Sequence, residues 1–284
     1  MSSESRSLLG TGPPSTSPRV RSTLLGAAHP GPALAVTLLA AAFAVSTGLA
    51  PGRAALVTAA VLAGQLSIGW GNDLLDARRD RAVGRTDKPL ATGELPLPVA
   101  RFACAGAIAA TVVLSLACGL VAGAVHLGCV AAGWAYNLGI KATVWSWLPY
   151  ALAFGGLPVF VTLADPGSGP PPWWIVAAGA LLGVGAHLLN TLPDLADDEA
   201  TGVRGLPHRI GARAASVLAV AALTTASVVV AVGAGQVPRP VVALVLVAVV
   251  ALAGLALVAR GRVPFRAAIG IAVLDVLLLV VAAG

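Results

Sequence analysis

The sequence predicts an all-α integral membrane protein, and three observations support that fold class. Of its 284 residues, 57% are hydrophobic and only 11% are charged, which is unlike an ordinary soluble domain. Apolar runs long enough to cross a hydrocarbon core of roughly 30 Å recur along the chain. Basic residues gather in alternate loops between these runs, as expected of a chain that crosses a bilayer many times.

We expect nine apolar runs to form transmembrane helices. Residues 1–30 are rich in Ser, Pro, Gly and Arg and contain no apolar run, so we expect a disordered cytoplasmic tail there. Residues 31–284 then form one transmembrane domain. The expected helices cover residues 32–50, 54–72, 99–118, 120–137, 147–163, 172–192, 213–233, 240–258 and 264–283.

Several boundaries between the expected helices have recognisable causes. Gly119 alone divides the third helix from the fourth. Two tryptophans open the fifth helix and two more open the sixth, which is typical of residues at a membrane interface. The Pro-rich loop at 164–172 separates these two helices. The second and sixth helices lead instead into the polar segments 73–98 and 193–212.

The basic residues predict the topology. If the amino terminus is cytoplasmic, 16 of the 18 Lys and Arg residues lie on the cytoplasmic side, and only Arg53 and Arg239 lie on the other. This asymmetry places the chain in the cell membrane with its carboxyl terminus on the opposite side. The net charge of +6 then reflects topology and attraction to anionic lipid. A nucleic-acid partner is not expected.

Two acidic segments hold nine of the twelve carboxylates. The first is GNDLLDARRDRAVGRTDKPLATGE at 71–94, and the second is NTLPDLADDEATG at 190–202. Each begins at the cytoplasmic end of an even-numbered expected helix. Acidic side chains are costly near a bilayer, so two such groups at one membrane face indicate a site for divalent cations.

The spacing of the acids supports a metal site in each segment. Asp73, Asp76 and Asp80 fall at i, i+3 and i+7, which places them with Asn72 on one broad face if the second helix continues. Asp194 and Asp198 repeat the i, i+4 spacing of Asp76 and Asp80. Oxygen ligands without His or Cys favour Mg²⁺ over zinc.

Mg²⁺ commonly binds through one or two carboxylates together with substrate phosphates. Two such half-sites facing each other across a cavity would therefore hold a diphosphate. Three nearby cations are placed to neutralise its remaining charge; these are Lys88, Lys141 and Arg204.

The same residues resemble the signatures of the UbiA superfamily of intramembrane prenyltransferases. The first segment resembles the pattern N-D-x-x-D-x-x-x-D, and its continuation V-x-R-T-x-x-K-P-L-x-T-G looks like the hydroxybenzoate polyprenyltransferase branch. PDLADDEATGVRGLP is similar to the second signature of the family. Between them, AYNLGIK at 135–141 resembles a segment with a tyrosine and a phosphate-binding lysine.

The resemblance implies a bundle of nine spans around a central cavity, where Mg²⁺ binds an isoprenyl diphosphate. It assigns Lys141 to the diphosphate and Tyr136 to the neighbourhood of the reactive carbon. Asp73 either binds metal or orients groups of the loop. The metal ligands that it implies are Asn72, Asp76 and Asp80 for one ion, and Asp194 and Asp198 for the other.

The implied function is Mg²⁺-dependent transfer of an isoprenyl group to a small lipophilic or aromatic acceptor similar to a quinone precursor. Thr191 and His29 depart from the family pattern, which puts an aromatic-acid acceptor in doubt. His187 either orients or deprotonates the acceptor, or it packs between helices. Asp275, an acid within the ninth expected helix, is either functional or paired with a polar neighbour.

Three other interpretations compete with a prenyltransferase. A terpene cyclase would use the same residues, with the ionised chain attacked by its own double bond. A CDP-alcohol phosphotransferase requires D-x-x-D-G-x-x-A-R, whereas Ala77 stands at the position of the Gly. A membrane transporter would spread its acids through the depth of the bilayer, and here only Asp275 is so placed. The sequence does not fix the prenyl length, the acceptor or the oligomeric state.

Overall fold

The computed structural model describes residues 23–195, 198, 202–259 and 263–283, and every regular element among them is helical. This confirms the all-α fold class. The long helices are α2 (Pro30–Ser46), α3 (Pro51–Ala82), α5 (Leu97–Ala117), α6 (Leu120–Leu138), α7 (Leu148–Leu163), α8 (Trp173–Thr191), α10 (Leu206–Gly233), α11 (Arg239–Val258) and α12 (Val263–Ala283). Short helical segments are α4 (Pro89–Thr92), η1 (Ile140–Ala142) and η2 (Leu192–Asp194).

Seven of the described helices are long and apolar enough to cross a membrane. The other two, α2 and α7, are apolar but have only 17 and 16 residues. At a rise of about 1.5 Å per residue they reach roughly 25 Å, slightly less than a typical hydrocarbon core. Each expected run thus corresponds to a helix, while the count of nine spans stays a prediction.

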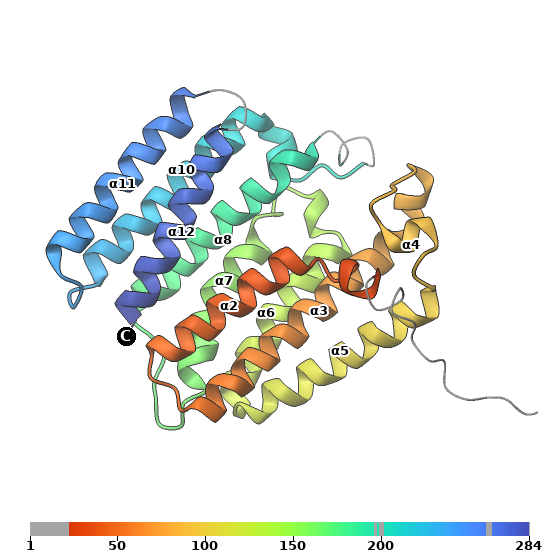
Figure 1. Ribbon diagram of the computed structural model, residues 1–284, viewed down its shortest axis with the longest axis horizontal. Coiled ribbons are helices and arrows are strands. Elements are labelled where there is room, and N and C mark those ends of the chain that lie inside the picture. The colour runs from red at the N-terminus through yellow and green to blue at the C-terminus, as the bar shows by residue number, and fades with distance from the viewer. Residues whose placement is uncertain (1–22, 196–197, 199–201, 260–262, 284) are drawn as a thin grey trace, which may run out of the picture.

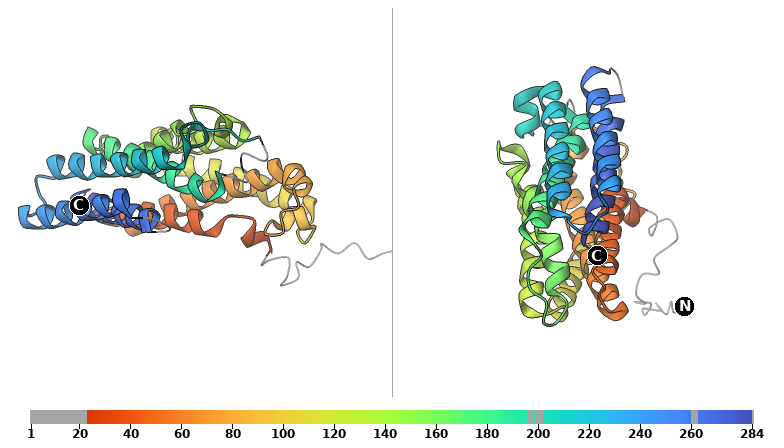
Figure 2. Two further views of the ribbon diagram at one scale, coloured as in Figure 1. Left: turned by 90° about the horizontal axis from the view of Figure 1, so that it is seen from above. Right: turned by 90° about the vertical axis from the view of Figure 1, so that its left-hand side faces the viewer.

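The helices form a closed bundle in which neighbours in sequence pack side by side, and α12 returns to contact α2 (Figure 1). Seen from the side, the bundle has two layers, with α2 and α12 in one and α7, α8 and α10 in the other (Figure 2). The end of α3, α4 and the connection from α8 to α10 lie toward one end of the bundle, and the carboxyl terminus lies at the other. Both acidic segments are therefore at the same end.

Helix α3 is longer than the expected range 54–72. It continues ten residues past position 72 and ends at Ala82. Its 32 residues span roughly 48 Å, well beyond a hydrocarbon core. Arg79 and Arg81 lie in its last turn, where positive charge complements the helix dipole. Gly84 follows with φ 70°, a conformation that glycine adopts at low cost. The first acidic segment is thus held on a rigid helical extension.

Glycines set the spacing between α7 and α8. A Cβ at Gly179 or Gly183 of α8 would collide with the backbone carbonyl groups of Phe154 or Tyr150 on α7. Small residues allow helix backbones to approach closely inside a membrane. This close contact fixes Tyr150 near the end of α8 that leads into the second acidic segment.

The segment before α2 is packed where the structure describes it. Residues 23–26 are helical, and Ala27 and Ala28 are buried. The Trp70 indole Nε1 donates a hydrogen bond to the Leu24 carbonyl at 2.9 Å. Residues 23–29, assigned above to a disordered tail, are therefore part of the fold, and residues 1–22 of that tail lie outside the described residues.

Candidate active site

The acids of the first segment share one face of α3, as their spacing predicts. Asp73, Asp76 and Asp80 are only 2%, 9% and 5% exposed. Buried carboxylates are costly unless they are paired or bind a cation. This burial rules out a simple solvated surface for these three acids.

Asp76 is held by two cations from different parts of the chain. The Lys141 Nζ donates to both of its carboxylate oxygens, at 2.7 and 3.0 Å, and Arg79 donates at 3.0 Å. Lys141 also reaches the Asn72 Oδ1 at 3.5 Å. Gly139, with φ 150°, ends α6 and leads into η1, which carries Lys141. The structure thus brings together three residues that the sequence assigned to metal or diphosphate.

Asp73 is the centre of a second polar cluster. Its Oδ1 accepts hydrogen bonds from the Lys88 Nζ at 2.7 Å and from the His29 Nε2 at 2.8 Å. Lys88 and His29 are also 3.0 Å apart. The Asp73 Oδ2 is buried and has no hydrogen-bond partner among the described residues. These contacts tie the start of α2 and the loop after α3 to one buried carboxylate.

The loop after α3 is folded back onto its own helix. The Arg85 backbone N–H donates to the Asp80 carbonyl at 3.0 Å, and the Arg85 guanidinium forms two hydrogen bonds of 2.8 Å with Asp87. These hydrogen bonds lower the pKa of the Asp87 carboxyl to about 2. The closed loop places Lys88 at the start of α4, beside Asp73.

The second acidic segment is only partly described, since Asp197 and Glu199 lie outside the described residues. Asp194 is exposed on η2. The Asp198 carboxyl is 29% exposed and lies 3.7 Å from the His208 Nε2. Its backbone carbonyl accepts a hydrogen bond from the Val203 N–H at 2.9 Å. The chain therefore turns back at Asp198 before α10 begins.

The electrostatic environment of Asp198 links the two segments. Burial raises the pKa of this carboxyl, and the neighbouring charges of His208, Arg79 and Lys141 oppose that rise. Arg79 and Lys141 are also the two hydrogen-bond donors to Asp76. The carboxyl groups of both segments thus lie within electrostatic reach of the same two cations.

The loop that carries Arg204 covers the Lys141 segment. A Cβ on the neighbouring Gly205 would lie 2.6 Å from the Lys141 carbonyl oxygen and 2.9 Å from the Ser146 Oγ. Arg204 itself is exposed, and its carbonyl accepts a hydrogen bond from the Arg209 Nε at 3.0 Å. This close approach keeps the start of α10 against the loop between α6 and α7.

An aromatic cluster lies beneath the acidic segments. Tyr136 contacts the edges of Tyr150 and His187, with ring centroids 5.3 and 5.8 Å apart. Thr191 interacts with the Tyr136 hydroxyl. Tyr136 also lies within electrostatic reach of Asp76 and Asp198, one from each acidic segment.

His187 is anchored as well as buried. Its Nε2 is 3.0 Å from the Ser146 Oγ, which also accepts a hydrogen bond from the Leu206 N–H at 3.0 Å. The Ser146 Oγ keeps its hydroxyl proton and a second lone pair, so it can pair with either tautomer of the imidazole. Both interpretations of His187, packing and acceptor contact, fit this position beside Tyr136.

Most of the sequence matches a known protein family. Residues 33–282 match the UbiA prenyltransferase family. The chain belongs to that family. It is 35% identical over 203 residues to the bacteriochlorophyll synthase 33 kDa chain of Cereibacter sphaeroides. That match covers 66% of this chain and 65% of the relative, so the chain spans slightly less than two thirds of the relative's length.

Solved structures share the same fold. A digeranylgeranylglyceryl phosphate synthase superposes with a TM-score of 0.72 at 16% identity, covering 93% of this chain and 98% of the other. A UbiA homologue of Archaeoglobus fulgidus, bound to DMAPP and Mg²⁺, gives 0.69 at 18% identity, with 91% and 99% covered. At these identities the likeness establishes the UbiA fold for this chain.

The chemistry of the donors in this UbiA protein fits a magnesium ion. Among the described residues, no three His, Cys, Asp or Glu side chains are gathered closely enough to form a metal centre by themselves. The carboxylates contact the chain's own Lys and Arg residues instead. The oxygen-only donor set and the partnerless, buried Asp73 Oδ2 are nevertheless what a hard cation requires.

Several site residues escaped the sequence analysis. Arg79 lies between two signature acids but carries no separate signal. His29 was noted only as a departure from the family pattern, although it binds Asp73. His208 and Ser146 are brought to Asp198 and His187 by folding alone. For His208, the only signal in the sequence was its position, ten residues after Asp198 and close to the second acidic segment.

Proposed function

We propose that this chain is a Mg²⁺-dependent membrane prenyltransferase. It transfers an isoprenyl group from an isoprenyl diphosphate to a small lipophilic or aromatic acceptor similar to a quinone precursor. The observation that carries the proposal is the position of Arg79 and Lys141, which donate hydrogen bonds to Asp76 and lie within electrostatic reach of Asp198. The two acidic segments lie around these two cations. Such a site suits an anionic ligand that binds together with a metal ion.

The ligand assignments follow the two segments. Mg²⁺ bound there would stabilise the negative charge of the departing diphosphate. Lys141, Lys88 and Arg204 are the cations that would contact the diphosphate oxygens. The residues that would hold metal are Asn72, Asp76 and Asp80 on α3 and Asp194 and Asp198 after α8, with Asp73 as a ligand or as an anchor for Lys88.

The chain's own residues support each step of the transfer. The allylic C1–O bond breaks and its electron pair leaves with the diphosphate, whose charge Lys141 and Lys88 neutralise. Tyr136 places its ring, which attracts positive charge at its face, beside the allylic cation. The surrounding helices exclude water from this cation. A nucleophilic carbon or oxygen of the acceptor then bonds to C1, and the acceptor releases its proton.

The relatives support the class of the donor substrate. The homologue of Archaeoglobus fulgidus was solved with DMAPP and also with GPP, each together with Mg²⁺. The relative of Cereibacter sphaeroides is a bacteriochlorophyll synthase chain. We place the protein in the cell membrane with its amino terminus and both acidic segments in the cytoplasm. Its carboxyl terminus lies on the opposite side.

Activity of the purified protein in nanodiscs tests this proposal. With geranyl, farnesyl or geranylgeranyl diphosphate, a panel of phenolic acceptors and Mg²⁺, we expect diphosphate release and a prenylated product. Asp76→Asn and Asp198→Asn should abolish turnover, whereas Asp87→Asn, in the first acidic segment but bound to Arg85, should retain it. A cyclic hydrocarbon formed without acceptor would identify a cyclase instead.

Lipid analysis identifies the acceptor directly. Mass spectrometry of lipids should reveal one product that is lost in cells lacking the protein and more abundant in cells overproducing it. Its mass gives the prenyl length and the acceptor together. Unchanged lipid profiles in both strains, with inactive purified protein, would argue against a prenyltransferase.

A further inference from the structure

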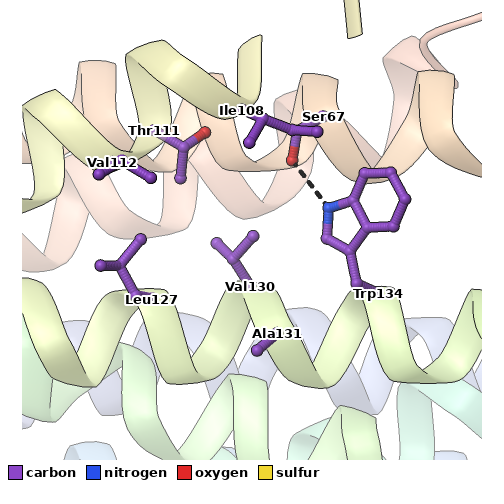
Figure 3. A pocket seen from close by; sticks show the side chains of 8 residues that line it. All are labelled: Ser67, Ile108, Thr111, Val112, Leu127, Val130, Ala131 and Trp134. Carbon is purple, nitrogen blue, oxygen red and sulfur yellow. Dashed lines mark hydrogen bonds between the residues drawn. The ribbon is translucent and has the colours of Figure 1, made fainter. Parts of the chain in front are cut away.

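A cavity of about 330 Å³ lies between α3, α5 and α6, and none of its lining residues belongs to the acidic segments (Figure 3). Side chains from α5 and α6 point toward each other across it, and the Trp134 indole closes one end. Its walls are formed by Ser67, Ile108, Thr111, Val112, Leu127, Val130, Ala131 and Trp134. None of these described lining residues is charged.

The cavity opens toward lipid. Ile108 and Val112 on α5 are 41% and 40% exposed, and Val113 and Leu116 on the same helix are also exposed. Exposed apolar side chains on a helix that spans a membrane face hydrocarbon chains. The opening of the cavity therefore adjoins the bilayer.

The polar atoms on its walls are already satisfied within the protein. The Trp134 Nε1 donates to the Ser67 Oγ at 3.3 Å, Ser67 donates to the Gly64 carbonyl at 2.8 Å, and Thr111 donates to the Ala107 carbonyl at 2.7 Å. No side-chain donor on the described walls is left to bind an anionic ligand, and no wall residue carries a charge. The cavity thus complements a plain hydrocarbon.

The volume and depth of the cavity suit one lipid tail. A water-sized unit occupies about 30 Å³, and a methylene group is of similar size, so the space accommodates roughly ten methylene groups. Trp134 is about one turn from the end of α6 beside the acidic segments, and Leu127 is roughly 16 Å from that end. A tail would enter from the leaflet on that side and reach toward the middle of the bilayer.

We infer that this cavity binds the acyl chain of a bilayer phospholipid, as a site separate from the reaction chamber. Trp134 and Tyr136 are two positions apart on α6 and so point in nearly opposite directions. Tyr136 faces Tyr150 and His187, whereas Trp134 faces α3. Under the proposed function the isoprenyl chain of the donor would lie on the Tyr136 side, whereas the acyl-chain site does not depend on that reaction.

The bound chain has a structural consequence for the site. A Cβ at Gly71 would collide with the Trp134 ring, so the indole lies directly against α3. Gly71 precedes Asn72, the first residue of the acidic signature. An acyl chain packed beneath Trp134 keeps the indole against this turn of α3.

Photolabelling in nanodiscs tests the inference. The probe is phosphatidylcholine carrying a diazirine near the end of one acyl chain, with crosslinks mapped by peptide mass spectrometry. We expect labelling of 108–112 and 127–134 to saturate at a low mole fraction of probe. Labelling of the exposed face of α11, around Leu244 and Val247, should instead rise in proportion to the probe.

Cavity-filling variants provide the control. Ala131 is exposed, so Ala131→Phe can fill the space without disturbing the packed interior, and it should reduce saturable labelling at least tenfold. Val247→Phe on α11 should leave it unchanged. Proportional labelling that Ala131→Phe does not affect would mean annular lipid only and would overturn the inference. Competition by geranylgeranyl diphosphate, or crosslinks between two copies through α5 and α6, would overturn it as well.

Discussion

Replacing Lys141 with methionine separates diphosphate binding from metal binding. The Lys141 ammonium donates to both oxygens of Asp76, and the two side chains are only 13% and 12% exposed. Charge-assisted hydrogen bonds contribute about 1.5–3 kcal/mol each. If Lys141 transfers to the diphosphate when substrate binds, Lys141→Met should weaken diphosphate binding roughly 10- to 100-fold.

In Lys141→Met, metal binding should become tighter while diphosphate binding becomes weaker. Lys141 occupies the carboxylate that we assign to Mg²⁺, and its removal leaves Asp76 with Arg79 as its remaining cation. Binding of Mn²⁺ alone, measured by electron paramagnetic resonance, should therefore tighten severalfold in Lys141→Met. Breaking a buried ion pair costs about 3–5 kcal/mol of stability, so the variant should also gain more thermal stability from Mg²⁺ than the wild type.

Calorimetry with an isoprenyl thiodiphosphate, which resists ionisation, gives the second half of the comparison. Arg101→Met, which removes an exposed cation near the start of α5, is the matched control and should change neither affinity. If Lys141→Met weakened metal and diphosphate binding equally, Lys141 would have only a structural role and the exchange of partners would be refuted.

Two further predictions concern the surroundings of the first acidic segment. His29→Ala should cost about 0.5–1.5 kcal/mol of stability by removing a hydrogen bond to Asp73, and should speed proteolysis at the start of α2; equal proteolysis rates would mean that this contact does not anchor the segment. Gly71→Ala should lower the melting temperature through collision with Trp134, at about 1–3 kcal/mol. The double variant with Trp134→Ala should recover part of this loss, and no recovery would locate the strain elsewhere.

Local periodicity was sufficient to predict the common face of Asp73, Asp76 and Asp80. Once α3 continues through these positions, helical geometry alone places them together. The extension itself was only a condition of that prediction, because an apolar run ends at the first polar residues whether or not the helix continues. For the same reason α10 was expected to begin at residue 213, whereas it begins at Leu206 and is interrupted at Gly211, where φ is 81°.

Contacts between distant segments could not be read from spacing. His29 reaches Asp73 across 44 positions and Lys141 reaches Asp76 across 65, and such contacts depend on how the whole bundle packs. The cavity beneath Trp134 was equally hidden, since its walls are mostly ordinary Ala, Val, Ile and Leu residues in apolar helices. Signature residues identify the chemistry of the site, and tertiary packing decides which cations stand beside it.

Equilibrium binding of the isoprenyl thiodiphosphate, with Mg²⁺ and with a chelator, tests most directly whether the two acidic segments act as one site. Wild-type protein should bind only with metal present. Asp76→Asn and Asp198→Asn should each weaken binding at least tenfold, and the double variant should lose less than the two losses combined, since both groups hold one ligand. Tight binding in the presence of chelator, or a loss confined to one of the two variants, would contradict a joint site.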